Sequence, residues 1–184
     1  PFIDVPFQHA NPQILKSMKR PANAENNLER INSWRSICPD LIIRSTFIVG
    51  FPGETEEQFN DLLDFLRLAK IDRVGCFIYS DVDGATANSL ENQVPEKVKR
   101  ERHDRFMMVQ NEISKKKLLD KVGSIQTVLI DQVDEEFAKA RSYANAPEID
   151  GNIFLKNPEG LEPGDMLDVK IEYSEDYDLY AGPN

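Results

Sequence analysis

The first two thirds of the chain combine continuous apolar runs with apolar residues at helical spacing. Continuous runs, typical of parallel strands covered on both faces, occur at residues 2–8, 41–49 and 73–79. Helical spacing predicts helices over residues 13–19, 23–37, 56–69 and 95–121. This alternation of strands and helices indicates parallel βα units.

Capping residues and apolar faces support these helices. Asn11-Pro12 has the form of an N-cap and a first helical proline, and Thr55 with Gln58 forms a capping-box pair. The second helix should turn its apolar residues toward the sheet: Leu28, Ile31, Trp34 and Ile37. The third should bury Phe59, Leu62, Leu63, Leu66 and Ala69. The long fourth helix has one apolar side formed by Val98, Phe106, Met107, Val109 and Ile113.

The pattern changes after Gly123. Short strand candidates cover residues 125–133, 138–143, 153–155 and 166–173. Turns at 157–160 and 163–165 separate the last of them. About sixty residues of short strands predict a small β-barrel, so we expect two domains, 1–123 and 124–184.

Charge is distributed unevenly between these two parts. Of the 184 residues, 40% are hydrophobic, and the net charge is −10. Residues 1–123 contain 18 Lys and Arg and 18 Asp and Glu, whereas residues 124–184 contain 4 and 14, which gives 0 and −10. The acidic part is either a solvated surface or a docking surface for a basic partner.

Neither the cysteines nor the first residues indicate secretion. Cys38 and Cys76 lie too far apart for a zinc or disulfide framework, and we expect buried structural thiols in a reducing, cytoplasmic setting. Residues 1–6 lack a Met start and a signal-peptide layout. They have the pattern of a strand already under way, as in a fragment.

The segment from Arg44 to Thr55 carries the clearest functional signal. Strand formers lead into a Gly-Phe-Pro-Gly turn and then into an acidic, capped helix start. In α/β enzymes such a turn lets a small ligand approach the main chain closely, because no side chain obstructs it.

Several motifs, in order, resemble those of radical S-adenosylmethionine (SAM) methylthiotransferases. Residues 4–21 resemble the fourth strand and following helix of that family, residues 44–55 the fifth strand, and residues 72–87 the sixth strand and its loop. Residues 124–184 resemble the TRAM domain, an OB-like antiparallel barrel. The resemblance implies an α/β plus β fold: half of a radical SAM (β/α) open barrel, strands four to six, followed by TRAM.

Within the family the chain resembles the branch that modifies ribosomal protein. His9 after Gln8, the strand at 73–77 and the loop at 80–84 favour this branch over the tRNA branch, although Asp81 replaces its usual proline. The implied reaction adds a methylthio group to the β-carbon of an aspartate in small-subunit ribosomal protein twelve. The alternatives are a tRNA adenosine methylthiotransferase and a non-catalytic binding module.

The resemblance also implies cofactors: SAM and two 4Fe-4S clusters. The family holds its clusters with cysteines upstream of the fourth strand, and these ligands are absent from this chain. We therefore expect no catalytic and no metal-binding residue here, and a chain that is inactive alone.

The resemblance places the SAM site at the carboxyl ends of the strands. The implied cofactor-binding residues are Gln8, His9, Thr46, Ile48, Gly50, Gly53, Tyr79 and Ser80. Ile48 would contact the adenine, or else belong to the barrel core. His9 is either a functional or a structural residue, and Glu54 either crosses the loop or touches ligand.

The negative charge of residues 124–184 predicts the kind of partner that this domain binds. It should repel RNA, since RNA-binding barrels need basic residues, and attract a basic ribosomal protein; the alternative is a merely solubilising surface. The expected docking residues are Asp131, Asp134, Glu135, Glu136, Asp176 and Asp178. On the long helix, we expect Lys99, Arg100, Arg102, Arg105 and residues 115–117 to form a solvated, salt-bridged face.

Overall fold

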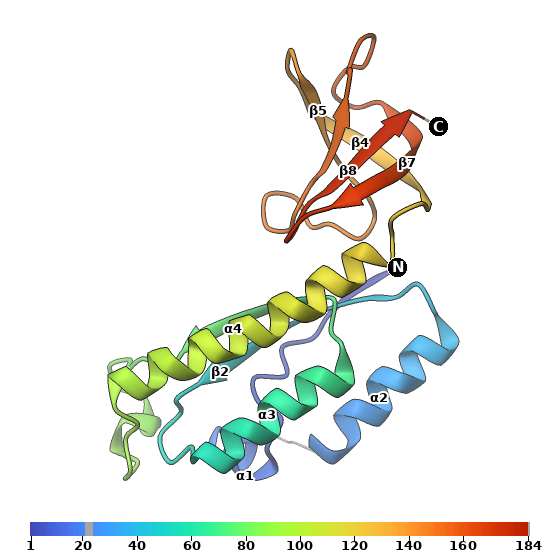
Figure 1. Ribbon diagram of the computed structural model, residues 1–184. Helices are drawn as coiled ribbons and strands as arrows, with labels where there is room; N and C mark the ends of the chain where they lie inside the picture. The colour runs from blue at the N-terminus through green and yellow to red at the C-terminus, as the bar shows by residue number, and fades with distance from the viewer. Residues whose placement is uncertain (21–23, 184) are drawn as a thin grey trace. The chain divides into compact units, whose positions relative to one another are not determined.

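The computed structural model describes residues 1–20 and 24–183, which form two compact units. One comprises Ile3–Gln110, and the other comprises Pro1–Phe2 with Asn111–Asn184. Figure 1 shows their elements. Among the described residues, no helix is both long and apolar enough to cross a membrane. The domain division expected at residue 123 stays a prediction.

The first unit contains a three-stranded sheet in the order β1 (Phe2–Asp4), β2 (Ile42–Val49) and β3 (Arg73–Ile78). β2 and β3 are parallel, as the apolar runs predicted, with Arg44 opposite Arg73 and Val49 opposite Ile78. β1 is shorter than the expected 2–8, since Pro6 has no N–H to donate to the ladder. The chain nevertheless stays beside β2 as far as an isolated parallel bridge between Gln8 and Phe47.

Helices connect and cover these strands (Figure 1). They are α1 (Pro12–Ser17), α2 (Ala24–Ile37), α3 (Glu56–Ala69), the short 3-10 helix η1 (Thr86–Ser89) and α4 (Glu96–Leu119). The expected start of the second helix at residue 23 lies outside the described residues. Both predicted caps are confirmed: Asn11 accepts from the N–H groups of Gln13 and Ile14, and Thr55 and Gln58 form a reciprocal capping box.

Aromatic rings fill the core between the sheet and the helices. Phe47 of β2 lies 6.3 Å from Phe7, 6.2 Å from Phe65 of α3 and 5.5 Å from Phe106 of α4, measured between ring centroids. The whole predicted stripe of α3 is buried. On α2, however, Ile37 is 81% exposed and the expectation for it was wrong. It is the last residue of that helix, where the chain turns away at Pro39.

The second unit contains a closed antiparallel barrel with one parallel pairing. Its strands are β4 (Ile125–Val133), β5 (Phe137–Arg141), β6 (Ile153–Lys156), β7 (Met166–Ser174) and β8 (Leu179–Pro183). They follow the order β4-β5-β6-β8-β7, and β7 pairs with β4 to close the circle. Sequence analysis missed β8, because it is short and ends in Gly-Pro, residue types that strands disfavour.

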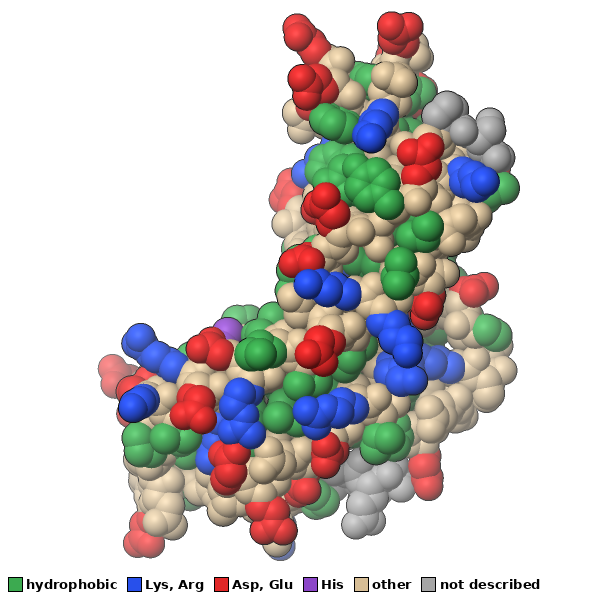
Figure 2. Space-filling view, in the orientation of Figure 1, with side chains coloured by type: hydrophobic (Ala, Val, Ile, Leu, Met, Phe, Trp, Pro, Cys, Tyr) green, Lys and Arg blue, Asp and Glu red, His purple; other side chains and the backbone are tan. Residues whose placement is uncertain are grey.

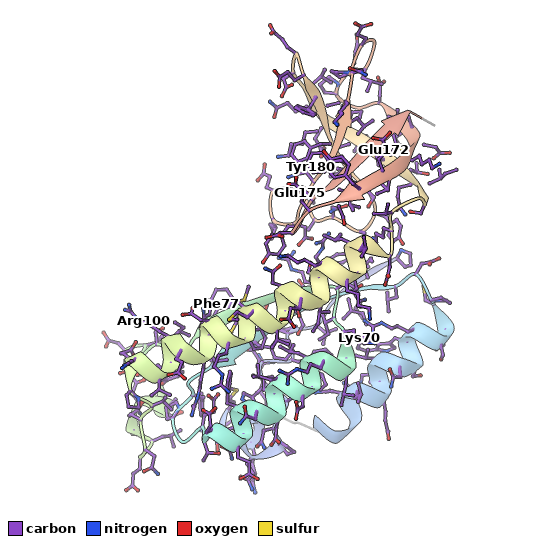
Figure 3. All side chains as sticks on the ribbon, in the orientation of Figure 1. Lys70, Phe77, Arg100, Glu172, Glu175 and Tyr180 are labelled. Atoms are coloured by element: carbon purple, nitrogen blue, oxygen red, sulfur yellow. The ribbon has the colours of Figure 1, made fainter. Side chains whose placement is uncertain are left out.

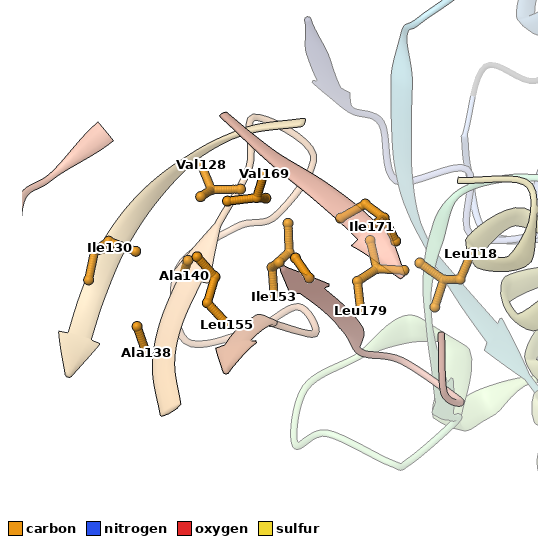
Figure 4. Packing of buried hydrophobic residues seen from close by; sticks show 11 residues of the cluster. Leu118, Val128, Ile130, Ala138, Ala140, Ile153, Leu155, Val169, Ile171 and Leu179 are labelled. Carbon is orange, nitrogen blue, oxygen red and sulfur yellow. The ribbon is translucent and has the colours of Figure 1, made fainter. Parts of the chain in front are cut away.

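Alternate residues of the five strands point into the barrel and form its core (Figure 4). Ile153 of β6 is fully buried there, between residues such as Leu155 and Leu179. Leu118, near the end of α4, packs against the same cluster. The barrel thus encloses a small core of aliphatic side chains.

Replacing Ile153 with Ala should destabilise the barrel by about 2–5 kcal/mol, because it leaves a cavity among close-packed neighbours. The measurement is urea unfolding followed by amide NMR signals of the barrel strands. The matched control is Ile149→Ala, since Ile149 is 68% exposed and its loss should cost under about 0.5 kcal/mol. Equal losses in the two variants would contradict the core described here.

Candidate functional site

The turn after β2 is built from glycines with backbone angles that other residues avoid. Gly50 has φ +75° and Gly53 has φ +83°, both in the left-handed region. A side chain at Gly50 would also collide with the aliphatic stem of Lys99. Gly53 anchors the turn further by donating its N–H to the Asn92 carbonyl at 2.9 Å. Glycine is therefore required at position 50 on two separate grounds.

A buried carboxylate, Glu54, holds this turn in place. The Gly50 N–H lies 3.1 Å from each of its two oxygens. The Arg102 guanidinium donates to Oε1 at 2.7 Å and to the Glu54 main-chain carbonyl at 3.0 Å. The side chain of Glu54 is fully buried, and these donors replace the water it has lost. Of the two roles considered for Glu54, the geometry favours the one that crosses the loop.

His9 belongs to the same network. It is fully buried, and its Nδ1 accepts from the Asn11 N–H at 2.9 Å. Nε2 therefore carries the proton in the neutral ring and donates to Glu54 Oε2 at 3.2 Å. Both ring nitrogens already have protein partners, which favours the structural alternative for His9; its assignment to the cofactor stays a prediction.

Two cations of α4 are buried, contrary to the solvated face that we expected. Lys99 donates to the Tyr79 carbonyl at 3.2 Å and to Glu96 at 2.7 Å, and Arg102 binds Glu54. The prediction was right for Arg105, which is half-exposed and pairs with Glu56 at 2.6 Å. Positions 99, 102, 106 and 110 share one helix face. Phe106 is the apolar residue of this face, and the helical spacing of the other three from it was the signal of their burial that sequence analysis missed.

A pocket of about 270 Å³ opens at the carboxyl ends of the strands. Three predicted residues line it: Gln8, Ile48 and Tyr79. The sequence reading did not assign its other lining residues: Ser17, Met18, Lys19, Arg20, Phe51, Thr86 and Ala87. The rings of Phe51 and Tyr79 meet edge to face at 5.2 Å. The pocket thus has apolar walls with a few polar groups, as small-molecule sites do.

The other predicted cofactor residues lie around this pocket rather than in its lining. Gly50 and Gly53 form the adjacent turn, Thr46 is half-buried on β2, and Ser80 is exposed just after β3. Gln8 adopts φ +68°, unusual for a residue with a side chain. The structure therefore brings together one residue from each strand end and adds α1 and η1 as further walls.

The acidic residues expected to dock a substrate have varied surroundings in the second unit. Asp131 pairs with Arg141 at 2.9 Å, and Asp176 pairs with Lys115 at 2.9 Å. Asp134 and Asp178 accept main-chain N–H groups of nearby turns. Glu135 and Glu136 are exposed. Four of the six thus already bind groups of this chain, and their docking role stays a prediction.

The two cysteines are both free thiols and half-buried. Burial raises the pKa of Cys76, and the negative charge of Glu54 raises it further. Within the part of the chain that the structure describes, no group of three or more His, Cys, Asp or Glu residues could hold a metal ion.

Glu54→Gln should destabilise the first unit by about 3 kcal/mol, because buried Arg102 keeps only the exposed carboxylate of Glu56, 3.5 Å from its Nε, as a counter-charge. Urea unfolding followed by fluorescence of Trp34, the single tryptophan, measures this loss. Glu57→Gln is the matched control, because Glu57 is exposed in the first turn of α3. A Glu54→Gln loss no larger than that of the control would show that the network contributes little.

Cys76 should react slowly with thiol reagents at pH 8, because its raised pKa keeps the thiol protonated. The Cys38→Ser variant isolates this thiol, and its labelling rate should climb only at pH values well above 9. The same variant in urea is the control, since unfolding restores an ordinary pKa. Equal rates in the folded and unfolded states at pH 8 would refute the argument.

Comparison with known proteins agrees with these features. Residues 1–66 match the family model of the radical SAM superfamily, and residues 122–183 match that of the TRAM domain. Three relatives share the name "Ribosomal protein uS12 methylthiotransferase RimO". The protein from Vibrio cholerae is 59% identical over 181 residues, covering 98% of this chain and 38% of the relative. That from Methylobacillus flagellatus is 60% identical over 183 residues, covering 100% and 42%.

The third, from Acinetobacter baumannii, is 58% identical over 185 residues, covering 98% of this chain and 41% of the relative. The chain therefore spans about two fifths of the length of these relatives. The resemblance to methylthiotransferases drawn from residues 4–21, 44–55 and 72–87 is confirmed, as is the expected fold class. The chain is part of a radical SAM domain followed by a TRAM domain, of the RimO type.

Proposed function

We propose that this chain serves a methylthiotransferase that adds a methylthio group to the β-carbon of an aspartate in ribosomal protein uS12. The observation that carries this proposal is the identity of 58–60% to RimO proteins along nearly the whole chain. Likeness at this level covers both the βα segment with the pocket and the barrel. In this proposal the first unit contributes to the cofactor site and the second to substrate docking.

The pocket fits part of a SAM molecule. Ile48, Phe51 and Tyr79 offer an apolar surface suited to an adenine ring, and Gln8 offers an amide that can bind polar edges. In this proposal the chain's own share of the site is the adenosine end, because the apolar wall suits an adenine ring.

In the proposed enzyme, SAM and a reduced 4Fe-4S cluster would supply the radical chemistry that activates the carbon–hydrogen bond. The residues of this chain orient the adenosine and exclude water from one side of it. Glu54 and Arg102 act on the pocket indirectly, because they fix the turn from Gly50 to Gly53, which contains the pocket residue Phe51. In this proposal a second 4Fe-4S cluster, held by cysteines outside this chain, would supply the sulfur.

The charge of residues 124–184 supports a protein substrate. Their 4 basic and 14 acidic residues give a net charge of −10, which repels the phosphates of RNA and attracts a Lys- and Arg-rich protein. This negative charge, with the names of the relatives, favours uS12 over tRNA as the substrate. The names of the relatives also favour the compartment where ribosomes are assembled as the site of action.

A chimera tests the proposal. The matching 181 residues of the Vibrio cholerae relative are replaced by this chain, and the chimera is expressed in cells that lack methylthiotransferases for both uS12 and tRNA. We expect mass spectrometry to detect a methylthio group on uS12 and none on tRNA adenosine. If tRNA is modified instead, the proposed substrate is wrong. If neither uS12 nor tRNA is modified, the proposed function is wrong.

A matched chimera with Ile48→Asp serves as the control for the pocket. A charged side chain on the apolar wall should weaken SAM binding without disturbing the barrel. Modification of uS12 should fall at limiting SAM and recover in part at higher SAM. Unchanged modification at every SAM concentration would contradict the assignment of the pocket.

A further inference from the structure

Four aromatic side chains form a row across neighbouring strands of the barrel. Phe154 of β6 is opposite Tyr180 of β8, and Tyr180 is opposite Tyr173 of β7. Phe137 of β5 extends the row, with its ring centroid 6.3 Å from that of Phe154. Phe154 and Tyr180 lie 5.5 Å apart, and Tyr180 and Tyr173 stack in parallel at 4.3 Å. We call these four residues the aromatic row.

The aromatic row is on the outside of the barrel. On β5 and β6 its members alternate with residues of the core: Ala138 follows Phe137, and Ile153 and Leu155 flank Phe154. Tyr180 is likewise flanked by Leu179 and Ala181. On β7 the register shifts between Ile171 and Tyr173, so Tyr173 does not follow this alternation. Tyr173 is 37% exposed, and the other three are half-buried. Figure 2 shows hydrophobic side chains among acidic and basic ones on this unit, and Figure 3 labels Tyr180 near Glu175.

The chain's own side chains show what the aromatic row attracts. The Lys156 ammonium lies 5.4 Å from the centroid of the Tyr173 ring, a cation–π contact. The Tyr180 hydroxyl donates to Glu175 at 3.2 Å. Glu172 is exposed on β7 beside Tyr173, and Lys139 is opposite Phe154. The two cations and two carboxylates that border the row cancel in charge. The net charge of −10 of residues 124–184 therefore comes from the rest of the barrel, and it attracts further cations.

We propose that the aromatic row is a docking surface for an arginine-rich, extended segment of a polypeptide. Guanidinium groups stack on aromatic faces, and they are less strongly hydrated than the ammonium of lysine. A bound arginine would displace Lys156 from Tyr173 and pair with Glu172 or Glu175. The inference rests on the proposed function only for the identity of the partner, a basic ribosomal protein.

Stacking alone would also suit nucleic-acid bases, which aromatic platforms on related barrels bind. Such sites need basic residues along the backbone path. Residues 124–184 contain 14 acidic and only 4 basic residues, which disfavours the binding of phosphates. Charge therefore selects a cationic polypeptide over RNA.

Binding of a fluorescein-labelled arginine–serine peptide to the complete chain, measured by anisotropy, tests the proposal. We expect Tyr173→Leu to weaken binding roughly fivefold, because leucine keeps bulk but loses the π-face. Tyr143→Leu is the matched control, since Tyr143 is also an exposed tyrosine of this unit but lies outside the row, and it should bind as the unchanged chain does. A lysine–serine peptide should bind more weakly than the arginine peptide.

A second pair of variants separates stacking from net charge. Lys156→Gln and Lys170→Gln remove one positive charge each, but only Lys156 covers a ring of the row; Lys170 is opposite Gly182. Charge alone predicts equal tightening of peptide binding. We expect Lys156→Gln to tighten it more, because it also removes the internal competitor for Tyr173. Both chains should show the barrel signals of the unchanged chain by NMR.

The inference is overturned if Tyr173→Leu and Tyr143→Leu bind the peptide equally, or if Lys156→Gln and Lys170→Gln have equal effects. Tighter binding of a single-stranded RNA than of the peptide would also overturn it. The chimera described above distinguishes a failure of this inference from a failure of the proposed function. An unchanged rate of uS12 modification by a Tyr173→Leu chimera at limiting uS12 would refute the aromatic row alone, whereas no modification by the unchanged chimera would refute the function.

Discussion

The buried carboxylate of Glu54 is the constraint on which the first unit depends. Moving a carboxylate out of water costs several kcal/mol unless charge and hydrogen bonds replace the solvent. The replacement comes from three places far apart in the sequence: His9, the Gly50 N–H and Arg102. Satisfying one charged group therefore fixes a strand end, a turn and a long helix relative to one another, and the strand end and the turn contribute Gln8 and Phe51 to the pocket.

Local signals account for what could be predicted from the sequence. The caps at Asn11 and Thr55 and the buried stripe of α3 depend on residues near one another in the chain. The barrel could be expected for the same reason, since turn residues punctuate short strands. The parallel order of β2 and β3 follows from the helix that connects them. In physical terms, such features can be predicted from the conformational propensities of the residues and from the periodicity of apolar positions alone.

Features that depend on distant partners could not be predicted in this way. The burial of Lys99 and Arg102 follows from carbonyl and carboxylate acceptors contributed by Tyr79 and Glu54, some twenty and fifty residues earlier. A charged residue on a helix is normally solvated, so their charge assigned Lys99 and Arg102 to a solvated, salt-bridged face. Met18 and Phe51 were missed as pocket residues because only the folded chain brings α1 beside the turn.

The position of β8 in the barrel bears on how this unit acquires its structure during synthesis. Its residues, Leu179–Pro183, lie between β6 and β7, and β6 has no other strand on that side. The circle of hydrogen bonds therefore cannot close until these five residues have left the ribosome. Before that moment, β6 and β7 present unpaired edges of the kind that associate with other chains. The nascent barrel is thus most vulnerable to aggregation just before β8 emerges from the ribosome.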